Sequence, residues 1–211
     1  EGKKDQNAGF LLCNELRKYD KVLPIIINSS EAANRTFAEQ NEMGFIQKGS
    51  KTYSKELRRL LTDTFGFGDF VFKNPQTGEE VARIHNIQEL QSAIFNIPDD
   101  SLRYHFGRNH ASRWLFSRAM FPIARFMKGV LIQDYEDTAP VRRMLFDALV
   151  LYRRVKNQGI VAEFQKGRFD KYSNFARIGE GSLGGKGRGL AFMDIMLKRH
   201  PELKNYPNVH I

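Results

Sequence analysis

The chain contains 211 residues, of which 41% are hydrophobic and 12% are aromatic, and this composition excludes a disordered, solvated tail. Its single cysteine, Cys13, excludes a disulfide framework and any metal site built from cysteines alone. The formal net charge of +9 would suit nucleic acid, an anionic membrane or a phosphorylated small molecule, but Lys and Arg are spread through nearly every segment, which disfavours nucleic acid.

The first 66 residues alternate between helical and strand patterns. Apolar residues recur at helical spacing over 7–19, and Cys13 lies within this apolar face, where we expect a small buried side chain. The β-branched run at 22–30 predicts a strand buried on both faces of a parallel sheet, and a second strand is predicted at 44–48. Helices are predicted after each strand, at 29–43 and 50–66. This alternation is typical of right-handed βα units and predicts half of a doubly wound α/β domain.

The pattern changes at Gly66. Residues 66–85 predict a β-hairpin, because two strand patterns flank an Asn-Pro-Gln-Thr-Gly turn. From Ile87 to about Gly129 the pattern is helical, with Pro98 starting a helix that we expect Pro122 to bend or end. A long helix is predicted over 138–159, with Gly159 as its cap, and the chain closes with a strand at 175–179, a glycine-rich loop and a helix over 189–200.

His105 and His110 are five residues apart within the predicted helix. At this spacing their side chains would point about 140° from each other, so one metal ion could not readily bind both. We therefore expect packed or hydrogen-bonded histidines, with no metal site and no catalytic role. Trp114, Phe116 and Phe121 are expected in the core.

No run approaches the roughly 18 to 20 apolar residues that a membrane span needs, and no charged-then-apolar leader opens the chain, so we expect a cytoplasmic protein. The sequence also begins within a helical pattern, with no strand before it. We therefore expect it to be part of a longer protein.

The stretch from Phe175 to Met193, FARIGEGSLGGKGRGLAFM, is a candidate phosphate-binding loop. Successive backbone N–H groups of a glycine-rich turn can converge on an anion, and a following helix adds its positive end. Gly179, Gly181 and Gly184 satisfy G-x-G-x-x-G, a weak motif, but the segment fails the P-loop pattern. Local chemistry leaves two interpretations open, a phosphate site or a glycine turn that serves only tight packing.

The segment GSLGGKGRGLAFM resembles the N-terminal signature of the nucleotide-binding domain of phosphoenolpyruvate synthases and pyruvate, phosphate dikinases. The resemblance implies the start of an ATP-grasp-like domain in which Lys186 binds ATP and Gly184 and Gly185 shape the loop. We also expect Gly187 at the phosphate site, and we expect the charges of Lys186 and Arg188 to attract a triphosphate. The resemblance also implies ATP and Mg²⁺ as cofactors of the whole protein, which would transfer phosphate from ATP to an enzyme histidine and then to pyruvate. This chain alone is not expected to be catalytic or to bind either cofactor tightly.

Residues 1–66 resemble the second half of a response-regulator receiver domain. The resemblance implies a switch in which Ser29 or Ser30 ends one strand, Lys48 ends the next, and Phe45 is the aromatic residue that moves on activation. A hydroxyl and an ammonium group together can compensate the charge of a phosphoryl group. A receiver-like segment placed before a nucleotide-binding start resembles large bacterial phosphoenolpyruvate synthase-like proteins.

We therefore expect three segments: a receiver-like half, a hairpin with a helical connector, and a helix with the nucleotide-binding start, at 1–66, 67–136 and 137–211. The expected function is part of an ATP-dependent phosphotransferase with a regulatory or docking segment. The alternative is a non-catalytic signalling module; DNA binding would instead need a helix-turn-helix or winged effector after Gly66. Expected partners are nucleotide, neighbouring domains, pyruvate for the whole protein, and a second copy through an exposed sheet edge.

Overall fold

The computed structural model describes residues 8–21, 23–166 and 170–202, and the described part is a mixed α/β protein with small sheets. The chain divides after Leu145 into two compact units. None of the described helices combines the length and the apolar composition that crossing a lipid bilayer requires.

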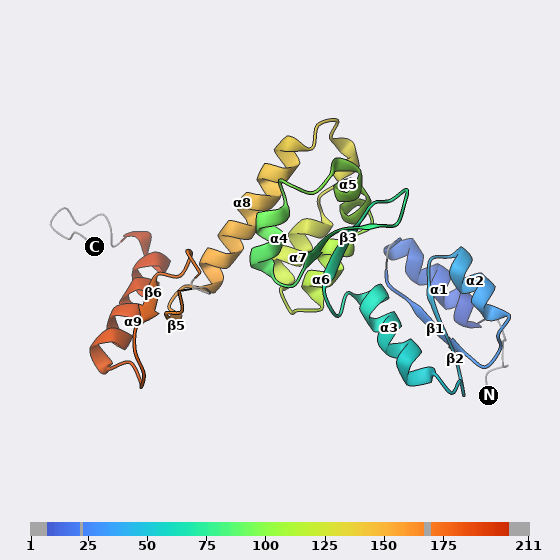
Figure 1. Cartoon of the computed structure of the whole chain (residues 1–211), viewed down its shortest axis with the longest axis horizontal. Coiled ribbons are helices and arrows are strands. Elements are labelled where there is room, and N and C mark those ends of the chain that lie inside the picture. Colours follow the sequence, from blue (N-terminus) through green and yellow to red (C-terminus); the bar gives the residue numbers. More distant parts are fainter. Residues whose placement is uncertain (1–7, 22, 167–169, 203–211) are drawn as a thin grey trace. The chain divides into compact units, whose positions relative to one another are not determined.

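The first unit begins with a parallel β-strand pair and its helices (Figure 1). Strands β1 and β2 pair in parallel, with Ile26 opposite Gly44 and Ser29 opposite Gln47, as the βα pattern predicts. A small core on one face joins Cys13, Ala38, Met43 and Phe45, so the expected burial of Cys13 is confirmed. The elements are α1 (Ala8–Tyr19), β1 (Ile26–Ser29), α2 (Asn34–Gln40), β2 (Gly44–Gln47) and α3 (Tyr53–Phe65).

The prediction that the first strand is buried on both faces is wrong. Its isoleucines Ile26 and Ile27 are half-buried and Asn28 is exposed, whereas Gly44, Phe45 and Ile46 of β2 are buried. The difference arises because α3 packs mainly against β2.

The predicted hairpin is confirmed as β3 (Phe70–Lys73) and β4 (Glu80–Ile84). The strands are antiparallel, with Phe70 opposite Ile84 and Phe72 opposite Ala82. In the turn, the Asn74 side-chain oxygen accepts hydrogen bonds from the backbone N–H groups of Gln76 and Thr77, at 2.8 and 3.1 Å. This asparagine therefore fixes the turn that the sequence indicates.

Helices pack against the hairpin: α4 contacts β4, and α5 contacts β3. They are α4 (Ile87–Ala93), α5 (Asp99–Gly107), α6 (His110–Phe116) and α7 (Phe121–Lys128), followed by a short 3₁₀ turn, Ile132–Asp134, and by α8 (Ala139–Lys156), which continues into the second unit. Most of the largest fully buried side chains lie in this part of the chain: Leu90, Ile94, Leu102, Trp114, Leu115, Met127, Ile132, Val141 and Leu145.

The single long helix predicted after Pro98 is wrong. It breaks at Asn109, which has a φ of 57°, a left-handed conformation that asparagine tolerates better than most residues. Pro122 lies in the first turn of α7, where its missing N–H costs nothing, and therefore begins a helix instead of ending one. Of the three expected core aromatics, Trp114 is fully buried, Phe116 is half-buried and Phe121 is exposed.

A buried arginine ties α8 to the loop between α4 and α5. The guanidinium of Arg142 donates to the backbone carbonyls of Ile94 and Ile97 and pairs with the carboxylate of Asp99. Thr138 accepts from Arg142 Nε at 3.0 Å and donates to Asp99 at 2.8 Å. Arg142 lowers the pKa of Asp99, chiefly through the hydrogen bond that its guanidinium donates to the Asp99 carboxylate.

The second unit contains the end of α8 and a second parallel pair, β5 (Val161–Glu163) and β6 (Phe175–Arg177), followed by α9 (Gly185–Arg199). The side chain of Arg153 pairs with Asp170 at 2.7 Å and lies over the ring of Tyr172. Gly159 has a positive φ of 68°, but α8 ends at Lys156, so Gly159 lies in the turn after the helix and the prediction that it caps the helix is wrong.

Candidate functional site

The glycine-rich loop connects β6 to α9, which is the strand-loop-helix order that the sequence predicts. The helix begins earlier than expected, so Gly185, Lys186 and Gly187 form its first turn and Gly184 is its N-cap. The backbone N–H of Arg188 donates to the carbonyl of Gly184 at 3.1 Å and closes this turn. Glycine lowers helix propensity by about 1 kcal/mol per residue without forbidding the helix, which is why the start was misplaced.

Packing does not explain all of these glycines. A Cβ atom added at Gly184, Gly185 or Gly189 would meet no other heavy atom within 4 Å, whereas one at Gly187 would lie 2.8 Å from the side chain of Leu183. Gly179 and Gly181 differ, because their φ angles of 94° are conformations that other residues rarely adopt. The open glycines leave the backbone at the start of α9 accessible to a ligand.

The same turn carries positive charge at the positive end of the helix dipole. Lys186 and Arg188 are both exposed, and no acidic residue lies in the first turn. Arg188 Nε donates to the carbonyl of Leu183 at 2.8 Å, whereas Lys186 makes no hydrogen bond or ion pair with the residues that the structure describes. Two cations at a helix N-terminus are unfavourable unless an anion compensates them.

The residues predicted to form a receiver-like switch lie on β1 and β2 or directly after them. The backbone N–H of Lys48 donates to the carbonyl of Ser29 at 2.8 Å, so the structure brings these two residues together. Ser29 Oγ accepts from the side chain of Asn34 at 2.9 Å, and both Ser30 and Lys48 are exposed. Phe45 is buried in the small core.

The prediction that His105 and His110 point away from each other is wrong, whereas the prediction that they are packed or hydrogen-bonded is confirmed. Because Asn109 breaks the helix, the two histidines lie on α5 and α6, and their Nδ1 atoms are 3.0 Å apart. The backbone N–H of Lys73 donates to His105 Nε2 at 2.8 Å. The histidines are thus hydrogen-bonded to each other. The one signal of this arrangement in the sequence is Asn109, because asparagine tolerates the left-handed backbone conformation that ends a helix.

Burial lowers the pKa of both histidines. The pKa of His105 falls to about 4, through burial first and then through the positive charge of Lys73. The pKa of His110 falls to about 3, through burial and then through Arg113, His105 and Arg108. Both rings are therefore neutral at physiological pH.

Within residues 8–21, 23–166 and 170–202, no three His, Cys, Asp or Glu side chains gather in a way that could hold a metal ion. Comparisons with models of protein families, with curated proteins and with solved structures find no match to this chain.

Proposed function

We propose that the loop leading into α9 binds the phosphates of ATP as part of a phosphoenolpyruvate synthase-like phosphotransferase. The observation that supports this proposal most directly is the positively charged, glycine-bordered first turn of α9, with Lys186 exposed. A phosphate seated there would accept hydrogen bonds from first-turn N–H groups and would compensate the charges of Lys186 and Arg188.

On this proposal the second unit is the beginning of an ATP-grasp-like nucleotide-binding domain in a cytoplasmic protein. Gly184 and Gly185 would let phosphate oxygens approach the backbone, and Lys186 would neutralise them. Mg²⁺, when bound with ATP, would bridge phosphate oxygens and reduce their charge. Transfer to an enzyme histidine and to pyruvate would need further domains, so this chain supplies nucleotide binding and not the complete reaction.

The test compares two variants that each remove one positive charge from α9. Lys186→Ala removes the charge from the first turn, and Arg199→Ala removes an exposed charge from the last turn. MgATP binding is measured by calorimetry on the protein expressed from its complete gene. We expect Lys186→Ala to weaken binding about tenfold or more, as loss of a charge-assisted hydrogen bond should, and Arg199→Ala to leave it unchanged.

In the 211-residue chain, where tight binding is not expected, the same site is followed by NMR. Millimolar ATP should shift the amide signals of Gly184, Gly185 and Gly187 in the wild-type chain and in Arg199→Ala, and much less in Lys186→Ala. Equal ATP affinity of the full-length wild type and of Lys186→Ala would remove this lysine from the site.

The contact between Ser29 and Lys48 favours a second candidate function, a receiver-like signalling or docking module. Adjacent parallel strands place a hydroxyl residue and an ammonium residue at one sheet edge, where a phosphoryl group could be sensed. A phosphorylatable aspartate encoded upstream of this chain would favour this function, and an upstream segment without an acidic cluster would leave a docking or structural role. Neighbouring domains or a second copy would be the partners.

A further inference from the structure

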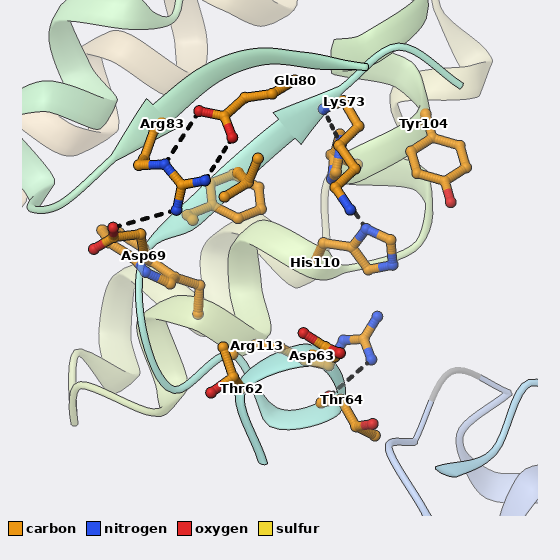
Figure 2. A pocket seen from close by; sticks show the side chains of 15 residues that line it. Thr62, Asp63, Thr64, Asp69, Lys73, Glu80, Arg83, Tyr104, His110 and Arg113 are labelled. Carbon is orange, nitrogen blue, oxygen red and sulfur yellow. Dashed lines mark hydrogen bonds and ion pairs between the residues drawn. The ribbon is translucent and has the colours of Figure 1, made fainter. Parts of the chain in front are cut away.

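We propose that a cavity between the end of α3, the hairpin and the α5–α6 pair binds the phosphate or carboxylate group of a small molecule, with His110, Arg113 and Lys73 as its donors. The cavity has a volume of about 620 Å³ and belongs to the first unit. Figure 2 shows His110 between Lys73 and Arg113 in this cavity. The inference does not rest on the nucleotide loop of α9.

The hydrogen bonds of the two histidines decide which ring atom of His110 is a donor. His105 Nε2 accepts the backbone N–H of Lys73, so a neutral His105 carries its proton on Nδ1. That proton is donated to His110 Nδ1, which leaves the His110 proton on Nε2. His110 Nε2–H has no hydrogen-bond acceptor among the described residues, although its ring lines the cavity. The network therefore fixes a single N–H donor on the His110 ring that lines the cavity.

Arg113 adds unused donors beside it. Its guanidinium donates to the backbone carbonyls of Thr64, Arg108 and Asn109, at 3.1, 3.1 and 3.4 Å, and has no carboxylate partner among the described residues. A guanidinium has five N–H groups, so two of them remain. Burial lowers the pKa of Arg113, which means that its charge is incompletely compensated.

Lys73 and the residues on the opposite wall of the cavity determine which further groups of a ligand can be bound. The ammonium group of Lys73 makes no hydrogen bond or ion pair with the described residues, whereas Arg83 is occupied by Glu80 and Asp69. The charges identified as acting on the histidine pair, Lys73, Arg108 and Arg113, are all positive.

An oxyanion would therefore be attracted to the His110 side of the cavity. The volume exceeds that of a phosphate ion, and the remaining walls offer hydroxyl, carboxylate and aromatic groups, from Thr62, Thr64, Asp63, Phe70 and Trp114. The ligand class is thus a small metabolite that carries an oxyanion and polar groups.

The experiment uses inorganic phosphate and acetate as probes at constant ionic strength set by NaCl, with the ¹⁵N signals of the histidine rings as the readout. We expect a saturable shift of His110 Nε2 that is complete by about 10 mM phosphate. Saturation by phosphate alone would assign a phosphate-bearing metabolite, and saturation by acetate would assign a carboxylate. Shifts no larger than those in NaCl for either probe would overturn the proposal.

Two pairs of variants separate binding from folding. His110→Asn keeps an acceptor for His105 but loses the donor to the cavity, whereas His110→Gln places an amide donor near the position of Nε2. For these variants, binding is followed by backbone amide shifts around the cavity. Binding should be lost in His110→Asn and partly retained in His110→Gln. Lys73→Ala should weaken binding about tenfold, and Lys55→Ala, which removes an exposed charge outside the cavity, should not change it. Wild-type binding in both His110→Asn and Lys73→Ala would refute this donor set.

Discussion

Mild acid should destabilise the first unit because His105 and His110 are held neutral. An unfolded histidine has a pKa of about 6.5, whereas the folded pKa values are about 4 for His105 and about 3 for His110. As the pH falls below about 6.5, the unfolded chain takes up protons that the folded protein does not, so the folded state loses stability. The loss continues until the pH approaches the folded pKa values. Ionisation of most carboxyl groups changes below this window.

The expected loss follows from the two pKa values. A histidine that stays neutral on folding contributes about 1.4 kcal/mol less stability at pH 5.5 than near neutrality, so the pair should cost about 3 kcal/mol between pH 7.5 and pH 5.5. His110→Asn removes one of the two titrating groups. We expect this variant to lose about half as much stability over the same pH interval, whatever its absolute stability is.

Urea unfolding measures this loss through the fluorescence of Trp114, the only tryptophan of the chain. Trp114 is fully buried in the first unit and donates from Nε1 to the carbonyl of Gly68 at 2.9 Å, so its emission reports unfolding of the unit that contains both histidines. Equal stability of the wild type at the two pH values, or equal losses in wild type and His110→Asn, would refute the reasoning.

Two further predictions concern stability and use the same unfolding assay. Gly66 and Gly49 both have a φ of 76°, but a Cβ atom at Gly66 would lie 2.9 Å from the backbone of Trp114, whereas one at Gly49 would meet no heavy atom within 4 Å. Gly49→Ala should therefore cost about 1 kcal/mol of stability and Gly66→Ala about 2 to 4 kcal/mol. Equal costs would show that the packing around Gly66 is not tight. Arg142→Ala should cost about 2 to 4 kcal/mol, because it removes the buried guanidinium that donates to the carbonyls of Ile94 and Ile97, whereas the ion pair with the exposed carboxylate of Asp99 adds little; a cost below about 1 kcal/mol would contradict that role.

Local periodicity predicts the helices and the hairpin well. The helix expected over 7–19 spans Ala8–Tyr19, and the predicted hairpin contains both β3 and β4, because each of these segments carries a complete repeat of its own period. Two of the errors occur where one residue decides whether a helix continues or stops. Asn109 and Pro122 each look compatible with a bent helix, yet one breaks the helix and the other starts a new one.

The candidate sites differ in how far they can be recognised from the sequence alone. The loop before α9 is contiguous, so its glycines and Lys186 can be recognised together, and Ser29 and Lys48 meet because parallel strands end at the same edge. The cavity beside His110 could not be predicted in this way, because its donors come from two elements that are distant in the sequence, β3 and α6, and depend on the break at Asn109. Its geometry is a product of tertiary packing.

Because Cys13 is buried, the rate at which its thiol is modified measures how often the α1 region of the first unit opens locally. Burial raises the pKa of its thiol, an effect that nearby Arg17 reduces, and only 8% of the residue is exposed. A thiol reagent should therefore modify the closed protein slowly and the opened α1 region quickly. Because the chain has no second cysteine, every modified molecule records an opening event at this one position.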